Sequence, residues 1–172
     1  MNQCNSLTRQ DLTSVGVPYK QTFVIDVSNY QVSIDTYEAM LLHRVGFSIE
    51  TIFSMAFRMF NTYSPKRERG QAPVMIPQQS LSTIVDSVQP FRSAITNAHA
   101  QATNAGTCNL SLDNFKRLVN DNIIRMYIAC YPYYVNMYMG IVQHYQTDGV
   151  IIETINVTCS GNRIYFGVFN VL

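Results

Sequence analysis

The longest run of hydrophobic positions in the chain extends from Leu112 to Tyr145 and predicts a single long helix. At its start, Phe115, Leu118 and Val119 recur at the 3- and 4-residue spacing that places side chains on one helical face. Over residues 123–139 the polar face almost disappears, so this part of the helix is hydrophobic on nearly every side. Pro132 lies inside the run, and because proline has no amide hydrogen we expect a kink or a break there.

Shorter patterns on either side of this run predict the other elements. A β-branched run at 21–28 predicts a strand, and two β-rich runs around Gly161-Asn162 predict a hairpin with a two-residue turn. The spacing of hydrophobic residues behind Ser and Asp caps predicts further helices. The predicted helices cover 35–46, 48–60 and 80–88 with a continuation at 91–105, and the hairpin strands cover 150–159 and 163–171.

These elements predict a protein that is mainly α with a small antiparallel β element. We expect a bundle of about four helices, and a C-terminal hairpin that pairs with the N-terminal strand. The length fits one domain, residues 1–172. Within it, the polar residues 1–19 are expected to form a flexible arm, and the Pro- and charge-rich residues 64–79 an exposed loop.

The central helix raises the question of what covers it, because a helix that is hydrophobic all round is buried all round. Either it lies centrally among the other helices, or one of its faces meets another subunit. Charged residues make up only 13% of the chain, against about 25% in ordinary domains, which favours a surface partly covered by partners. A homo-oligomer is therefore expected. The residues assigned to its subunit interface are Tyr127, Tyr131, Tyr134 and Tyr138.

The tyrosine stripe has a second interpretation, because aromatic rings also stack on the bases of single-stranded nucleic acid. Such stacking requires basic residues between the rings. No Lys or Arg lies between Met126 and Gln143, so packing in a core or an interface is favoured.

Basic residues gather where two predicted helices begin. Arg92 opens the 91–105 helix, while Lys116, Arg117 and Arg125 precede the hydrophobic part of the long helix. If these helices pack antiparallel across the loop at Gly106, one end of the bundle carries a phosphate-binding patch. Ordinary ion pairing is the alternative, and its candidate partners are Asp86, Asp113 and Asp121.

The chain shows no pattern typical of an enzyme. It has no nucleophile elbow, phosphate loop or metal-ligand cluster, and its histidines are scattered. The four cysteines have no metal-ligand spacing and are expected to be free thiols, with Cys130 in the core. No cofactor, small-molecule substrate or membrane span is indicated. The net charge of +1 gives no global attraction to nucleic acid, so any such contact has to be local.

Two segments together resemble the coat proteins of rod-shaped plant RNA viruses, the tobamovirus-like family. The first runs from Phe23-Val24 to Tyr63 and resembles the family's opening Phe-Val and first helix pair. The second contains, in order, Pro90-Phe91-Arg92, Asn97, Gln101-Ala-Thr-Asn104, Leu112-Asp113, Lys116-Arg117, Asp121 and Ile124-Arg125. The resemblance implies a four-helix bundle that stacks into a rod around single-stranded RNA, and a location in the virion or the host cytoplasm. It also implies an RNA groove formed by Arg92, Lys116, Arg117, Asp121 and Arg125.

The sequence thus favours a self-assembling viral structural protein of the coat or nucleocapsid type. Such a protein would bind the phosphates of single-stranded RNA without sequence specificity. The alternative is a viral matrix or accessory protein that forms homo-oligomers without binding RNA.

Overall fold

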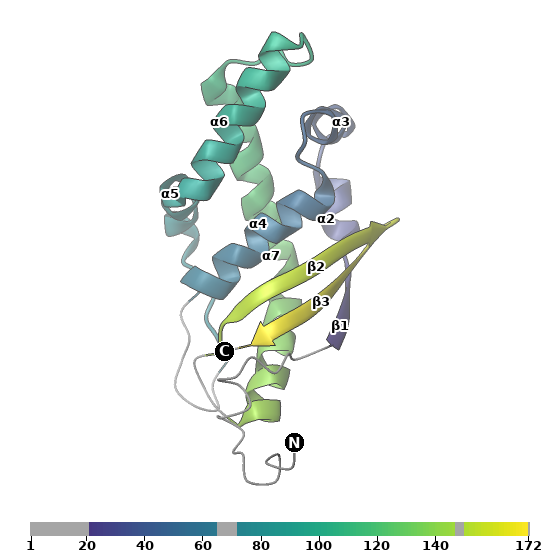
Figure 1. Ribbon diagram of the computed structural model, residues 1–172, viewed down its shortest axis with the longest axis vertical. Helices are drawn as coiled ribbons and strands as arrows, with labels where there is room; N and C mark the ends of the chain where they lie inside the picture. Colours follow the sequence, from purple (N-terminus) through teal and green to yellow (C-terminus); the bar gives the residue numbers. More distant parts are fainter. Residues whose placement is uncertain (1–20, 65–71, 147–149, 172) are drawn as a thin grey trace, which may run out of the picture.

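The computed structural model describes residues 21–64, 72–146 and 150–171 and is mainly helical with a small sheet (Figure 1). The helices are α2 (Ser28–Ser33), α3 (Thr36–Arg44), α4 (Ile49–Tyr63), α5 (Gln78–Ser87), α6 (Gln89–Asn104) and α7 (Leu112–Tyr145). The strands are β1 (Gln21–Asp26), β2 (Ile152–Ser160) and β3 (Arg163–Val171). The predicted fold class is confirmed. The described part holds six helices rather than about four, because α2 is a separate short helix and α5 and α6 are distinct.

The sheet has the strand order β1-β3-β2, and both pairings are antiparallel. In the hairpin turn, Gly161 has φ +62°, a conformation that glycine adopts without the steric cost of a Cβ. The register places Phe23 opposite Phe166, and their rings stack with centroids 5.3 Å apart. The predicted pairing of the C-terminal hairpin with the N-terminal strand is therefore confirmed.

The core lies where α7, α4 and the sheet meet, and Figure 1 shows α4 crossing α7 beside the strands. Phe53 and Phe57 of α4 form ring contacts with Phe166 of the sheet and with Tyr134 of α7. All four side chains are buried. The face of α7 that carries Tyr134 is thus covered within one copy of the chain, whereas Tyr133 next to it is 37% exposed. For the covered face, the first of the two alternatives holds.

Three helices begin at side-chain caps that the sequence suggests. The Asp35 carboxylate accepts hydrogen bonds from the amides of Tyr37 and Glu38, 2.8 and 3.4 Å away. The hydroxyls of Ser48 and Ser111 accept from the amide three residues further on, at the starts of α4 and α7. These caps satisfy backbone amides that the first turn of a helix leaves without partners.

Pro132 does not end the long helix, which continues without interruption to Tyr145. The proline ring is on the exposed side of α7. Its missing amide leaves only the carbonyl of Ile128 without its helical partner. Before the proline, Tyr127 shares a hydrogen bond with Ser64 at the end of α4, and after it Tyr134 packs against Phe60 of α4. Both halves of α7 are therefore held against α4. Of the two outcomes expected from the sequence, a break is therefore wrong.

The prediction of an exposed loop over 64–79 is wrong at both ends of that segment. Ser64 and Ile76 are only 3% and 2% exposed, and α5 already begins at Gln78. The hydroxyl of Tyr131 donates to the carbonyl of Pro73 at 2.7 Å, and the hydroxyl of Tyr127 accepts from the amide of Ile76 at 3.0 Å. Residues 65–71 and the predicted arm at 1–19 lie outside the described residues.

Candidate phosphate-binding site

A polar depression of about 400 Å³ lies where α5, α6 and α7 meet. Its walls are formed by Arg92, Lys116, Arg117, Asp86 and Asp113. Three of the four basic residues predicted to form a patch are thus brought together, although Arg92 is 24 residues from Lys116 in the sequence.

The hydrophobic pattern of α6 and α7 positions these basic side chains. Phe91 and Ile95 of α6 are buried, and therefore Arg92 is on the outer side of its helix. Phe115 and Val119 of α7 are buried in the same way. The second half of α6 packs against the start of α7, where the rings of His99 and Phe115 lie with their centroids 5.4 Å apart. This packing brings Arg92 to the same depression as the second turn of α7.

The two carboxylates of the depression have different environments. Asp86, at the end of α5, accepts a 2.6 Å hydrogen bond from the side-chain amide of Asn120 on α7. Asp113 is exposed in the first turn of α7, where a negative charge is favourable near the positive end of the helix dipole. With three basic and two acidic side chains, the depression carries a net charge of +1.

Two residues assigned to the RNA groove do not line this depression. The guanidinium of Arg125 instead donates to the carbonyl of Ser33, the last residue of α2, at 3.2 Å. Arg125 lies eight residues beyond Arg117, which turns it by about 80° around the helix axis. The prediction that Arg125 joins the patch is therefore wrong. Asp121 is exposed on α7 and is likewise not part of the depression.

The assignment of the tyrosine stripe to a subunit interface is also wrong, because the chain itself covers it. Tyr127 and Tyr134 are fully buried, Tyr138 is 4% exposed, and Tyr131 is half-buried. The ring of Phe60 on α4 contacts three of these tyrosines, with centroids 5.1 to 6.2 Å away. Burial raises the pKa of the Tyr131 phenol to about 12. A stripe of aromatic residues thus marks the intramolecular seam between α4 and α7.

Exposed hydrophobic side chains lie on other elements, in α2 and α3. Val32 is 83% exposed, and Tyr37 and Met40 are each 62% exposed. One signal in the sequence could have revealed this surface. Hydrophobic residues in α3 and directly after it occur at 37, 40, 41, 42 and 45, which is more than one helical face.

The described residues contain no group of three or more His, Cys, Asp or Glu side chains placed to hold a metal ion. No helix within the described ranges combines the length and hydrophobicity needed to cross a membrane. Comparisons with family models, with curated proteins and with solved structures find no significant match to this chain.

Proposed function

We propose that this chain is a self-assembling structural protein of the nucleocapsid type that binds RNA through its phosphates, without reading sequence. The observation that carries the proposal is the convergence of Arg92, Lys116 and Arg117 on one depression. The viral origin and the resemblance to tobamovirus-like coat proteins stay predictions from the sequence.

The chemistry of the depression suits a phosphate group. Guanidinium groups offer paired N–H donors that match phosphate oxygens, and the Lys116 ammonium adds a compact charge. Contacts of this kind neutralise charge and fix position but carry no sequence information. The support for self-assembly is different, since it comes from the exposed hydrophobic residues Val32, Tyr37 and Met40.

A homo-oligomer of the matrix or accessory type that binds no RNA is the second candidate. The observation that favours it is the presence of Asp86 and Asp113 in the same depression. These carboxylates repel a phosphate and offset two of the three positive charges. The two candidates differ in one measurable property, the affinity of the purified protein for RNA.

The test compares RNA binding by two triple variants with the same change in net charge. Arg92→Ala/Lys116→Ala/Arg117→Ala removes the patch. Arg58→Ala/Arg125→Ala/Arg163→Ala removes three exposed arginines that do not line the depression. We expect the patch variant to lose at least tenfold in affinity for a 12-nucleotide single-stranded RNA, measured by fluorescence anisotropy. The control variant should lose much less.

A further variant tests the direction of the electrostatic effect. Asp113→Asn removes one negative charge from the depression and leaves the hydrogen bond between Asn120 and Asp86 in place. A unit charge 4 Å from a phosphate is worth about 1 kcal/mol in water, so the affinity for RNA should rise about fivefold. If the patch and control triples weaken binding equally, the proposed site is wrong. If the wild-type chain binds no RNA, the second candidate replaces the first.

A further inference from the structure

Helix α3 has hydrophobic residues on both its inner and its outer side. Leu41 and Leu42 are each 2% exposed and pack into the core. Tyr37 and Met40 point outward with 62% of their surfaces exposed, and Val32 lies just before them in α2. Single exposed hydrophobic residues are normal on protein surfaces, but Tyr37 and Met40 are three positions apart and therefore neighbours on one side of α3, which is typical of a contact site. We call Tyr37 and Met40 the α3 patch.

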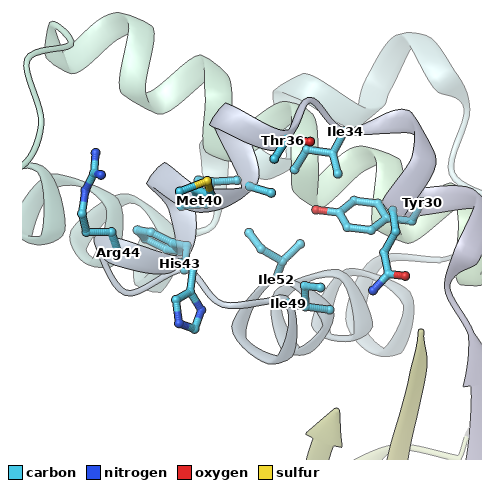
Figure 2. A pocket seen from close by; sticks show the side chains of 12 residues that line it. Tyr30, Ile34, Thr36, Met40, His43, Arg44, Ile49 and Ile52 are labelled. Atoms are coloured by element: carbon cyan, nitrogen blue, oxygen red, sulfur yellow. The ribbon is translucent and has the colours of Figure 1, made fainter. Parts of the chain in front are cut away.

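A hydrophobic depression of about 520 Å³ lies next to this patch, between α3 and the start of α4. Figure 2 shows Met40 of α3 facing Ile49 and Ile52 of α4 across the depression. Tyr30 lies at one end of it, and His43 with Arg44 lies at the other. Met40 thus belongs both to the α3 patch and to the wall of the depression. A hydrophobic projection and a hydrophobic hollow are therefore adjacent on one surface.

The charges along α3 are arranged with opposite signs at its two ends. Asp35 is exposed at the start of the helix, and His43 and Arg44 are exposed in its last turn. When two such helices lie antiparallel, the acidic end of one meets the basic end of the other. Parallel alignment would instead bring like charges together. A surface with this polarity fits a second copy of itself about a two-fold axis.

We propose that the α3 patch and the adjacent depression form a two-fold interface between two copies of this chain, with the two α3 helices antiparallel and crossing at Met40. In this register residue 37 of one copy lies opposite residue 43 of the other. The Tyr37 ring of each copy enters the His43 end of the other copy's depression and lies near Arg44, a cation–π arrangement. Each Arg44 guanidinium donates to the carbonyl of Thr107 in its own chain at 3.1 Å, and its remaining N–H groups approach Asp35 of the other copy. The inference rests on the self-assembly part of the proposed function and identifies the surface that performs it.

The size of α3 sets the expected strength of this contact. Nine residues extend over only about 14 Å, so the interface is at the small end of the range for specific complexes. We therefore expect a dimer with a dissociation constant in the micromolar range, seen as a concentration-dependent sedimentation coefficient. Larger assemblies would need further contacts.

Disulfide trapping tests the geometry, in a chain with Cys4 and Cys159 replaced by serine. Met40→Cys places a thiol at the two-fold axis and should give a cross-linked dimer on mild oxidation. Thr36→Cys alone should not cross-link, because antiparallel helices separate the two thiols by about 12 Å along the axis. A mixture of Thr36→Cys and Arg44→Cys chains should cross-link. Ala100→Cys, at an exposed position on α6, is the control for random collision.

A second pair of variants tests the energetics without cross-linking. Tyr37→Ser/Met40→Gln changes two exposed side chains, so the fold should persist while dimerisation weakens at least tenfold. Val24→Thr/Ile151→Thr changes two exposed hydrophobic residues elsewhere and should leave dimerisation unchanged. Cross-linking of Thr36→Cys alone, or equal dimerisation by both variants, would overturn the proposed interface. So would a wild-type chain that stays monomeric up to about 1 mM.

The outcome is separable from that of the RNA-binding proposal. A 12-nucleotide RNA measures the affinity of a single site, so the Tyr37→Ser/Met40→Gln variant should bind it as the wild type does. Loss of dimerisation with retained RNA affinity supports the α3 interface as an independent surface. RNA binding without any dimer overturns the α3 interface and leaves the phosphate site standing. A dimer without RNA binding overturns the phosphate site alone.

Discussion

Two tyrosines on the same helix, seven residues apart, should respond in opposite ways to the same substitution. Tyr127 and Tyr134 are both buried in the core, with 0% of their surfaces exposed to solvent. The Tyr127 hydroxyl accepts from the amide of Ile76 at 3.0 Å and shares a hydrogen bond with Ser64. The Tyr134 hydroxyl is buried next to the Cys130 thiol, a weak hydrogen-bonding group, and has no oxygen or nitrogen partner within the described residues. Replacing each by phenylalanine removes one oxygen and leaves the ring packing in place.

The expected magnitudes follow from these contacts. Tyr127→Phe leaves the buried amide of Ile76 without its partner, at a cost of about 1–3 kcal/mol, and removes a hydrogen bond from Ser64 that is worth about 1 kcal/mol. The free energy of unfolding should therefore fall by about 2–4 kcal/mol. Tyr134→Phe removes a buried polar atom whose neighbouring polar group is the weakly hydrogen-bonding Cys130 thiol, so stability should be unchanged or rise by about 1 kcal/mol.

Urea unfolding followed by circular dichroism measures both effects. With a slope of about 2 kcal/mol per molar urea, the midpoint of Tyr127→Phe should fall by about 1–2 M. The midpoint of Tyr134→Phe should stay level or rise. Equal losses in the two variants would refute the assignment of hydrogen bonds along this helix. Such a result would also make the tyrosine stripe a candidate subunit interface again.

Two further predictions concern titratable groups. Hydrogen bonds from Ser28 lower the pKa of the exposed Asp26 carboxyl below its ordinary value of 3.8. The bond from the Ser28 hydroxyl has the larger effect and the bond from its amide the smaller. The stability that these hydrogen bonds contribute is present at pH values above the Asp26 pKa of the unfolded chain. It is lost as the pH falls through the Asp26 pKa of the folded chain. In an NMR titration Ser28→Ala should raise the Asp26 pKa towards 3.8, and an unchanged value would contradict this origin. Burial raises the pKa of the Cys130 thiol to about 12 and that of the half-buried Cys159 to about 11. Iodoacetamide at pH 8 should therefore label Cys159 before Cys130 in the folded chain, as peptide mass spectrometry can show, and the reverse order would be inconsistent with this burial.

Local signals in the sequence were sufficient for most of the fold. The Ser48 cap and the Gly161-Asn162 turn are decided by neighbouring residues, and each is found where the pattern predicts it. For the helix before Gly46, Ser33 and Asp35 were both possible caps, and Asp35 is the one observed. The pairing of strand β1 with the hairpin could be predicted because the chain has few other β-rich runs. Of the kink or break expected at Pro132, the break does not occur, because packing against α4 compensates for one lost hydrogen bond.

The sequence could not decide which faces are covered, since covering depends on residues far away in the chain. Tyr134 looked too hydrophobic for one chain to bury, yet the phenylalanines of α4 enclose it. Tyr37 and Met40 lie in a helix that the pattern predicts, but the pattern does not tell that both are exposed. For the basic residues, proximity in sequence was a poor guide. Arg125 turns towards α2.

The most direct test of the central claim is the salt dependence of binding to a short single-stranded RNA. Each phosphate neutralised on a single strand contributes about 0.7 to the slope of log affinity against log salt concentration. Replacing Arg92, Lys116 and Arg117 by alanine should therefore reduce the magnitude of this slope by about 2, equally for RNAs of different sequence. A slope identical in the wild type and the patch variant would show that these three residues do not bind RNA phosphates, and would contradict the account.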